Sequence, residues 1–356
     1  MTLSLPIGST IGIIGGGQLG RMLSVAASRL GFRCHVFEPG ANPPAGQVAD
    51  QVTTAAYDDE DALRAFGTSV DIITYEFENI PTAALDLLQD LAPIHPGREA
   101  LRVSQDRLTE KTFLQELGLQ TAPFADVTDA TSLAAALDEL GTPSILKTRR
   151  FGYDGKGQAR IMSRDSAGQA LADMQGAPAI LEGFVDFSHE VSVIAARSLD
   201  GAVAAFDPGE NVHSDGILRT TTVPARLTIA QRTDAVLIAA KIANALNYVG
   251  VMGVELFVTS NGLIVNEIAP RVHNSGHWTQ NGCSVDQFEQ HIRAIAGWPL
   301  GDGQRHTDIV MENLIGEDMD RVPELAKTPD CALHLYGKAE TKSGRKMGHV
   351  NHIKRG

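Results

Sequence analysis

Short apolar segments alternate with helical segments along the first hundred residues, and this alternation restricts the fold more than any other feature of the sequence. Strands are expected at 10–14, 33–37 and 71–75, and helices at 18–30, 58–66 and 81–89. Strands separated by single helices pair in parallel, and the helices cover both faces of the sheet. The sequence therefore predicts an open parallel α/β sheet over residues 1–100.

The rest of the chain has a different pattern, because strands follow one another with few helices between them. We expect these strands at 144–147, 159–161, 179–182, 190–197, 251–258, 263–268, 309–314 and 332–336. Such a succession of strands is typical of an α+β arrangement. The sequence thus predicts a second domain over 101–300 and a small C-terminal lobe over 301–356.

Two helices are expected among these later strands. Residues 228–246 are predicted to form one helix, which is largely buried from Ala235 onward because it is mostly apolar there. The second is predicted by a stripe at helical spacing, which a capping box of Ser284 and Gln287 precedes. The stripe consists of Val285, Phe288, Ile292 and Ile295.

Composition excludes several classes of protein. The net charge of −13 argues against nonspecific binding to nucleic acid or to an anionic membrane, which requires a basic surface. The three cysteines, Cys34, Cys283 and Cys331, form no CxxC pair and indicate a reducing compartment. Neither a signal peptide nor an apolar run long enough to span a bilayer is expected. We therefore predict a cytoplasmic protein without nucleic-acid or membrane partners.

The glycine-rich segment Gly15–Gly20 follows a strand and opens a helix. It fits the G-x-G-x-x-G pattern, and Glu38 ends the next strand at the spacing of a ribose-binding acid. Glycines allow close approach of the backbone, and a helix N-terminus attracts anions. The motif leaves three interpretations open with equal weight: a dinucleotide, another phosphorylated substrate, or a tight turn without a ligand.

A second glycine-rich segment, 152–158, lies between two expected strands and is therefore neither a Rossmann turn nor a P-loop. Its backbone N–H groups and Lys156 can cover a triphosphate, and Lys147 can place an ammonium group on the phosphates. Arg149 and Arg150 add local positive charge. A flexible hairpin with a solvated basic patch is the less favoured alternative.

Glu255 and Glu267 lie in two consecutive apolar strands. If Ser260, Asn261 and Gly262 form a three-residue turn, the two glutamates face each other with Cβ atoms ~5 Å apart. Like charges at that separation repel, and a magnesium ion would compensate them. We favour this metal site over a solvent-facing pair in a different register.

The segment 269–279 follows the second glutamate directly and carries many polar groups. Arg271 offers a bidentate fork for an oxyanion. His273 can donate hydrogen bonds or transfer protons. We expect functional roles for these two side chains and a merely structural one for His277.

The order of these motifs resembles that of the ATP-grasp superfamily and, within it, the family of 5-(carboxyamino)imidazole ribonucleotide synthases. The resemblance extends over nearly the whole chain. The stretches that carry it are 17–23, 75–79, 106–111, 152–158, 215–219 and 270–281, of which the last is the most specific. It implies an ATP-grasp fold with an N-terminal Rossmann-like pre-ATP-grasp domain, a lid at about 125–188 and a small C-terminal lobe.

The resemblance also implies a reaction of purine biosynthesis. ATP phosphorylates bicarbonate to carboxyphosphate, which carboxylates the amine of 5-aminoimidazole ribonucleotide, as the intact intermediate or as CO2 released from it. The implied cofactors are ATP and Mg2+, with a homodimer as the assembly. Glu255 and Glu267 would hold magnesium, Arg271 and His273 would stabilise carboxyphosphate, and Asp154 would orient the substrate amine or accept its proton.

The implied binding residues form two groups. ATP would be bound by Arg107, Lys147, Gly152, Tyr153, Asp154, Gly155, Lys156, Gly157, Gln158, Glu182, Val185, Glu190, His213, Asn266 and Glu267. The substrates would be bound by Gln18, Leu19, Glu76, Tyr153, Asp154, Arg271, His273, Asn274, Ser275, Lys338 and Arg345. Lys338 and Arg345 would hold the 5′-phosphate.

Three alternatives remain at this point. A nicotinamide-dependent oxidoreductase would explain Gly15–Gly20 and Glu38, but not the second glycine loop or the glutamate pair. Another ATP-grasp ligase would use a different acyl donor, such as formate, or act as a biotin carboxylase. A nucleotide-binding regulatory protein without turnover is disfavoured by the full set of charged site residues.

Overall fold

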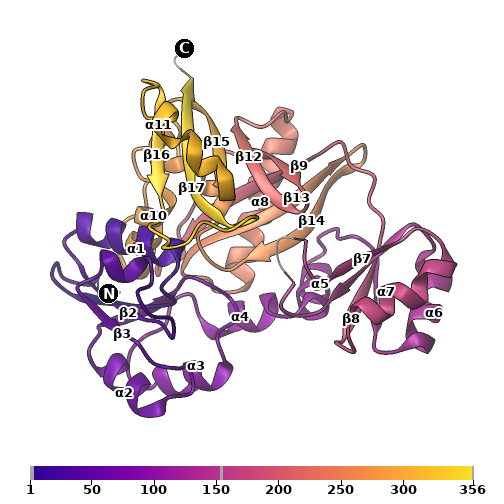
Figure 1. Ribbon diagram of the computed structural model, residues 1–356, viewed down its shortest axis with the longest axis horizontal. Helices are drawn as coiled ribbons and strands as arrows, with labels where there is room; N and C mark the ends of the chain where they lie inside the picture. Colours follow the sequence, from indigo (N-terminus) through magenta and orange to yellow (C-terminus); the bar gives the residue numbers. More distant parts are fainter. Residues whose placement is uncertain (1–3, 153–154, 355–356) are drawn as a thin grey trace.

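The computed structural model describes residues 4–152 and 155–354, and it shows a molecule built on three β-sheets (Figure 1). The N-terminal sheet is entirely parallel and has the order β3-β2-β1-β4. Its elements are β1 (Thr10–Ile14), α1 (Gln18–Arg29), β2 (Arg33–Phe37), β3 (Gln51–Thr53), α2 (Glu60–Thr68), β4 (Ile72–Tyr75) and α3 (Thr82–Leu88), with a 3-10 turn at Ala45–Gln47. The predicted α/β alternation is confirmed.

The second sheet belongs to a lobe that projects away from the rest of the molecule on the side opposite the N-terminal sheet (Figure 1). It is antiparallel, with the order β5-β8-β6-β7. Two helices lead into it, α4 (Arg98–Ser104) and α5 (Arg107–Glu116). The lobe contains β5 (Phe124–Val127), α6 (Ala130–Leu140), β6 (Ser144–Thr148), β7 (Gln158–Ile161), a 3-10 turn at Arg164–Ser166, α7 (Ala167–Asp173) and β8 (Ala179–Gly183). We call this lobe the lid.

The third and largest sheet is antiparallel, with the order β14-β13-β9-β11-β12-β15-β17-β16, and β10 pairs with β9. Its first part comprises β9 (His189–Arg197), β10 (Val203–Ala205), β11 (Gly209–Ser214), β12 (Ile217–Val223), α8 (Ile229–Ala245), β13 (Gly250–Thr259) and β14 (Gly262–Ala269). Its second part comprises α9 (Thr279–Gly282), α10 (Gln287–Ile295), β15 (Asp308–Ile315), α11 (Val322–Leu325), β16 (Cys331–Leu335) and β17 (Lys346–Lys354), with 3-10 turns at Asn274–Gly276 and Gly316–Arg321. The C-terminal strands therefore continue the central sheet, since β12 pairs directly with β15.

Strand β9 has two useful faces because successive side chains of a strand point to opposite sides. Val191, Val193 and Ala195 pack in the core that includes α8. Ile194 and Ala196 pack in the core that includes α10. Glu190 and Ser192 lie on this second face, at the polar start of the strand. The predicted site residue Glu190 is therefore on the face of the sheet that α10 covers toward the other end of β9.

Two details of the predicted helices are wrong. Helix α8 is not largely buried beyond Ala235, because Leu237 is 60% exposed and only one face of the helix contacts the sheet. Helix α10 is not capped by Ser284, because Asp286 accepts hydrogen bonds from the N–H groups of Phe288 and Glu289.

No helix in the described part of the chain is long and apolar enough to cross a membrane.

The β13–β14 hairpin aligns Glu255 with Glu267, as predicted, but by a different route. Thr259 pairs with Gly262, so the turn has two residues rather than three. A register shift next to Glu255 then leaves Asn266 as an extra residue in β14. Without this bulge, Asn266 would lie opposite Glu255 and the second carboxylate would point to the other face.

His291 links the N-terminal sheet to the central sheet from the interior of α10. It is 0% exposed; its Nε2 lies 2.7 Å from the Thr74 hydroxyl, and its Nδ1 accepts the N–H of Val251 at 3.1 Å. Burial, with a smaller effect of His95, lowers the pKa of His291 from 6.5 to about 3. The ring is therefore a neutral bridge between two domains.

We predict that His291→Leu lowers the free energy of unfolding by about 2–4 kcal/mol, because it leaves two buried polar groups without partners. In the wild type, the unfolded histidine takes up a proton below about pH 6.5 while the folded one does not. Its share of stability is therefore lost as the pH falls from 6.5 toward 3, by up to about 1.4 kcal/mol per pH unit. Urea denaturation at several pH values measures both effects.

The exposed histidine variant His306→Leu is the control and should change stability by less than about 0.5 kcal/mol. An unchanged pH dependence in His291→Leu, or a loss no larger than that of the control, would contradict the role of the bridge.

Candidate active site

A buried cluster of charges joins the lid to the rest of the molecule. Glu182 of β8 lies between two ammonium groups, at 2.9 Å from Lys147 Nζ and 3.5 Å from Lys111 Nζ. Burial would raise the pKa of Glu182, but Lys147 and Lys111 outweigh it and hold that pKa at about 2. The carboxylate is therefore ionised and fixes both lysines. Lys111 of α5 was not among the predicted site residues.

The bulge in β14 connects this cluster to the central sheet. The carbonyl of Asn266, the extra residue, accepts a hydrogen bond from Lys111 Nζ at 3.2 Å. Arg107, the first residue of α5, lies 3.0 Å from Glu267 through its Nη1 atom. Asn266 Oδ1 is buried and has no hydrogen-bond partner in the described residues. An unpaired buried acceptor beside ionised groups is typical of a site that a ligand completes.

Glu255 and Glu267 form the predicted carboxylate pair. Burial and then the charge of Glu267 raise the pKa of Glu255 to about 7. Burial opposes ionisation of Glu267 as well, but Arg107 outweighs it and lowers the pKa of Glu267. The two carboxylates lie on one face of the sheet. These carboxylates and the side-chain oxygen of Asn266 are hard oxygen donors, which magnesium prefers. The residues therefore fit the predicted metal.

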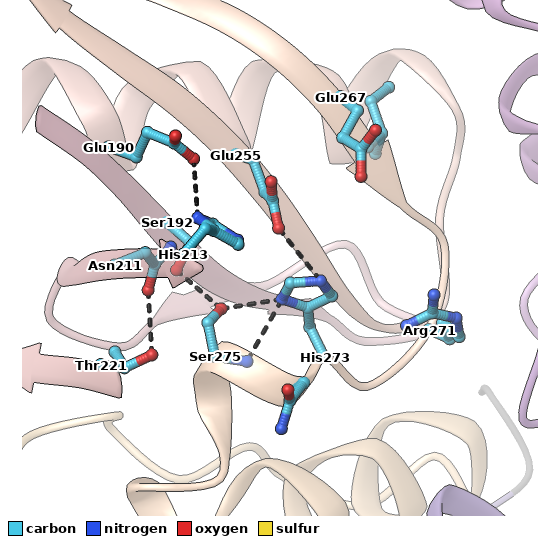
Figure 2. Close-up of polar contacts among 12 residues, drawn as sticks. Glu190, Ser192, Asn211, His213, Thr221, Glu255, Glu267, Arg271, His273 and Ser275 are labelled. Carbon is cyan, nitrogen blue, oxygen red and sulfur yellow. Dashed lines mark hydrogen bonds and ion pairs between the residues drawn. The ribbon is translucent and has the colours of Figure 1, made fainter. Parts of the chain in front are cut away.

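Glu190 and His213 lie next to Glu255 on the same face (Figure 2). His213 Nδ1 is 3.1 Å from Glu190 Oε2, and one ligand atom from each of the three residues lies within 4.8 Å of the others. Burial would lower the pKa of His213, but Glu190 outweighs it and raises that pKa. In the sequence, only the family resemblance groups Glu190 with His213; in the structure, their strands β9 and β11 pair directly.

Arg271 is held by a residue that the sequence did not single out for a role. Glu78, just after β4, accepts from Arg271 Nε at 2.6 Å and from Nη2 at 3.2 Å. Burial alone would raise the pKa of Glu78, but Arg271 outweighs it and lowers that pKa. The bidentate pair connects the N-terminal domain to the predicted catalytic segment and aligns the guanidinium plane.

His273 belongs to a series of polar contacts, which Figure 2 shows from Ser192 through Ser275 and His273 to Glu255. The Ser192 hydroxyl donates to Ser275 Oγ at 2.7 Å, and Ser275 Oγ lies 2.8 Å from His273 Nδ1. His273 Nε2 lies 3.3 Å from Glu255 Oε1. Burial, together with Arg271 and Lys346, lowers the pKa of His273 to about 3. The ring is therefore neutral.

The glycine turn after β1 binds carboxylates of the chain itself. Glu76 accepts from the N–H groups of Gly17 and Gly20, and Glu38 accepts from Gly16 N–H at 2.8 Å. A Cβ atom at Gly17 would lie 2.6 Å from Glu76 Oε1, so a larger residue there would displace this carboxylate. The amides that would bind the pyrophosphate of a nicotinamide cofactor are thus already engaged, which argues against the oxidoreductase alternative.

The second glycine loop passes from the lid toward the central sheet. Gly155 and Gly157 have φ values of 77° and 70°. A Cβ atom on Gly155 would lie 3.2 Å from Gly216 Cα, so the loop touches the turn between β11 and β12. Tyr153 and Asp154 lie outside the described residues. Arg149 pairs with Asp106 at 2.8 Å, and Arg150 donates to Gln105.

The other predicted binding residues are more dispersed. Asn274 exchanges side-chain hydrogen bonds with Asn313, and Ser275 is only 1% exposed beneath His273. Lys338 Nζ donates to the Lys346 carbonyl at 2.7 Å, and Arg345 Nη1 donates to the Glu340 carbonyl at 3.3 Å. Three further residues, placed only by element, are Gln18 and Leu19 in the first turn of α1 and Val185 in the segment after β8.

The loop that carries Lys338 and Arg345 docks on the N-terminal domain. Gln47 Nε2 donates to the carbonyl of Gly337 at 2.7 Å, and Arg21 Nη1 donates to Gln47 Oε1 at 2.7 Å. Segments that are almost 300 positions apart in the sequence therefore meet near the start of α1.

The expectation of a structural role for His277 is confirmed. His277 is 1% exposed, its Nδ1 is 2.9 Å from Gln287 Nε2, and its ring contacts that of His349 with centroids 4.7 Å apart. Its side chain is thus part of the core between α10 and β17.

Three domain families match the chain in consecutive segments. The ribonucleotide synthetase preATP-grasp domain matches residues 8–105, the ATP-grasp domain matches 112–288, and the phosphoribosylaminoimidazole carboxylase C-terminal domain matches 309–355. The predicted fold class is thereby confirmed.

Individual relatives agree with this division. The N5-carboxyaminoimidazole ribonucleotide synthase of Brucella melitensis biotype 1 is 56% identical over 99% of this chain and 98% of its own length. An ADP complex of N5-carboxyaminoimidazole ribonucleotide synthetase has 43% identity and a TM-score of 0.96, covering 99% of this chain and 94% of that one. The Aspergillus clavatus synthase in complex with ADP and 5-aminoimidazole ribonucleotide has 31% identity and a TM-score of 0.92, over 98% and 94% of the two chains. This chain therefore belongs to the N5-carboxyaminoimidazole ribonucleotide synthase family of ATP-grasp ligases.

Proposed function

We propose that this protein carboxylates 5-aminoimidazole ribonucleotide in purine biosynthesis, using ATP and bicarbonate. Bicarbonate oxygen attacks the γ-phosphorus of ATP, so that ADP leaves and carboxyphosphate forms. The substrate amine then attacks the carboxyl carbon, either of carboxyphosphate or of CO2 released from it, and phosphate leaves. The product amine loses a proton and becomes the carbamate of 5-(carboxyamino)imidazole ribonucleotide.

The observation that carries this proposal is the arrangement of four cationic side chains around three carboxylates, those of Glu182, Glu267 and Glu78. Lys147, Lys111 and Arg107 lie where the lid meets the central sheet, and Arg271 lies beside the end of β4. Phosphoryl transfer to bicarbonate depends on positioning and charge neutralisation rather than on a covalent intermediate with the protein. No nucleophilic side chain is required.

The ATP site is proposed between the lid sheet and the central sheet. Lys147 and the loop 152–158 would bind the phosphates, Glu182 and Val185 would flank the adenine, and Glu190 would accept from the ribose hydroxyls. The contact between Gly155 and Gly216 supports a loop that closes over the nucleotide. Such closure would exclude water from carboxyphosphate, which hydrolyses rapidly.

Magnesium is proposed as the metal, held by Glu255 and Glu267. When bound, it would neutralise charge on the transferring phosphoryl group. Arg107 already occupies one side of Glu267, so the arginine and the metal would share this carboxylate. Asn266 Oδ1 would find its missing partner in the same region.

The ribonucleotide is proposed to bind between the N-terminal domain and the C-terminal loop. Gln18, Leu19 and Glu76 lie at the start of α1, and Lys338 belongs to the loop that docks there through Gln47. Tyr153 and Asp154 are proposed to approach from the glycine loop. Lys338 and Arg345 would bind the 5′-phosphate, because they offer cations on an otherwise acidic protein.

We further propose three domains, at 1–100, 101–300 and 301–356, with the lid at about 125–188. We also propose a homodimeric assembly and a cytoplasmic location. The three cysteines support a reducing compartment, because Cys34, Cys283 and Cys331 are all free thiols.

The reaction predicts that ADP release from magnesium-ATP requires both 5-aminoimidazole ribonucleotide and bicarbonate. Labelled bicarbonate should enter an acid-labile product, and formate should not replace it. Lys147→Met should lower turnover at least about 100-fold, because a phosphate ligand and a partner of Glu182 are lost together. Lys241→Met, on the exposed face of α8, is the matched control and should keep full turnover. Dependence on formate and a different ribonucleotide would keep the ATP-grasp assignment but overturn the substrates.

Arg271→Lys should lower kcat about 100-fold, because a single ammonium cannot replace a bidentate fork on carboxyphosphate. Glu78→Gln should lower it less, since the amide oxygen can still accept one hydrogen bond from Arg271. Steady-state kinetics at saturating ATP measure both variants. Arg226→Lys, whose side chain is 77% exposed, serves as the control. A kcat of Arg271→Lys within threefold of the wild type would contradict the role of the guanidinium.

A further inference from the structure

We propose that Ser275 and Ser192 are positioning residues that fix His273 as a neutral imidazole with its proton on Nε2. The ring then presents an N–H donor toward Glu255 and the reacting groups, and it acts as a hydrogen-bond donor rather than as a proton carrier. The tautomer follows from contacts within the chain, whereas its catalytic use rests on the proposed function.

The contacts on Nδ1 identify this atom as an acceptor. The backbone N–H of Ser275 points at Nδ1 at 3.4 Å, and an N–H group can only donate. The hydroxyl of Ser275 lies 2.8 Å from the same atom. Ser192 donates its own proton to Ser275 Oγ at 2.7 Å, which leaves the Ser275 proton for Nδ1. Both serines are buried, at 1% and 2% exposure, so water does not compete with this order.

The opposite ring nitrogen faces an acceptor. His273 Nε2 lies 3.3 Å from Glu255 Oε1, an oxygen whose lone pairs can accept its N–H. Since Nδ1 carries no proton, the proton of a neutral ring must be on Nε2. At 3.3 Å this contact is long, and the N–H can turn to an oxyanion that arrives between His273 and Arg271 without breaking a short contact.

Other residues fix where the ring lies. Gln287 brackets the backbone of His273, because its Oε1 accepts from His273 N–H at 2.9 Å and its Nε2 donates to the His273 carbonyl at 2.8 Å. A Cβ atom on Gly253 would lie 2.8 Å from His273 Cβ, so β13 needs glycine there to admit the side chain. Gln287 and Gly253 place the ring, and the two serines decide which nitrogen carries the proton.

The contact at Nδ1 also determines the charge of the ring. An imidazolium carries a proton on Nδ1 and could not accept the N–H of Ser275, so the ring in this arrangement is neutral. Of the two roles predicted for His273, this geometry favours donation of a hydrogen bond from Nε2 over proton transfer.

The tautomer can be tested directly by two-dimensional 15N NMR of protein with labelled histidine, with the His273 signals assigned from their absence in His273→Gln. We expect the wild type to show the pattern of a neutral ring protonated on Nε2. Ser275→Ala should convert it to a mixture of tautomers, and Ser192→Ala should cause a smaller change in the same direction. A wild-type signal protonated on Nδ1 or on both nitrogens would overturn the proposal, as would an unchanged pattern in Ser275→Ala.

Kinetics test the consequence. Ser275→Ala should lower kcat about 10- to 100-fold, as the loss of an orienting partner does for other histidines, with the KM for ATP unchanged. His273→Gln should retain at least about tenfold more activity than His273→Asn, because the Gln side-chain amide reaches the position of Nε2 and that of Asn reaches Nδ1. Equal activities of these two variants would contradict a donor at Nε2.

Ser198→Ala is the matched control, because Ser198 is a buried serine just beyond the far end of β9 and its hydroxyl bonds to Asp200. It should leave both the NMR pattern and kcat unchanged, and thermal unfolding should show that all variants are folded. The NMR result does not need turnover. If the enzyme proved to act on other substrates, the NMR evidence for the tautomer would be unaffected. If the NMR spectra showed a different tautomer, the proposed reaction would be unaffected.

Discussion

Buried ionised side chains that must be paired are the constraint on which the rest of this structure depends. Glu182, Lys111 and Lys147 are almost removed from solvent where the lid meets the body of the protein. Removing one partner of such a cluster leaves an uncompensated buried charge, which costs several kcal/mol. The position of the lid sheet relative to α5 and β14 is therefore fixed by electrostatics as well as by apolar packing.

A single extra residue in β14 makes this arrangement possible. The bulge at Asn266 turns Glu267 to the same face as Glu255 and exposes a carbonyl that Lys111 uses. Bulges often redirect side chains next to functional sites. Here the same irregularity creates the carboxylate pair and connects it to the cations, so that one feature of the backbone positions the groups proposed to bind metal and nucleotide.

The N-terminal domain contributes through the short segment after β4. Glu76 reaches back to the amides of Gly17 and Gly20, while Glu78 reaches forward to Arg271. These two carboxylates, which are two positions apart, link the glycine turn to Arg271, and both lie beside the proposed ribonucleotide site. Burial opposes the ionisation of both, and burial raises the pKa of Glu76 even though backbone amides lower it. Shifted pKa values of buried carboxylates are common where these groups orient others for function.

The sequence by itself determined elements such as β1, α1, β13 and β14, because hydrophobic periods and glycine turns are local. The grouping of Lys147, Arg271 and the two glutamates in one site followed from the family resemblance and stays a prediction. The sequence did not reveal β17, since buried polar residues such as His349 and Asn351 interrupt the apolar alternation there. Only the tertiary structure decided the bulge, the partners Lys111 and Glu78, and the proton position on His273. Each depends on contacts between segments far apart in the chain, whose energies no local pattern contains.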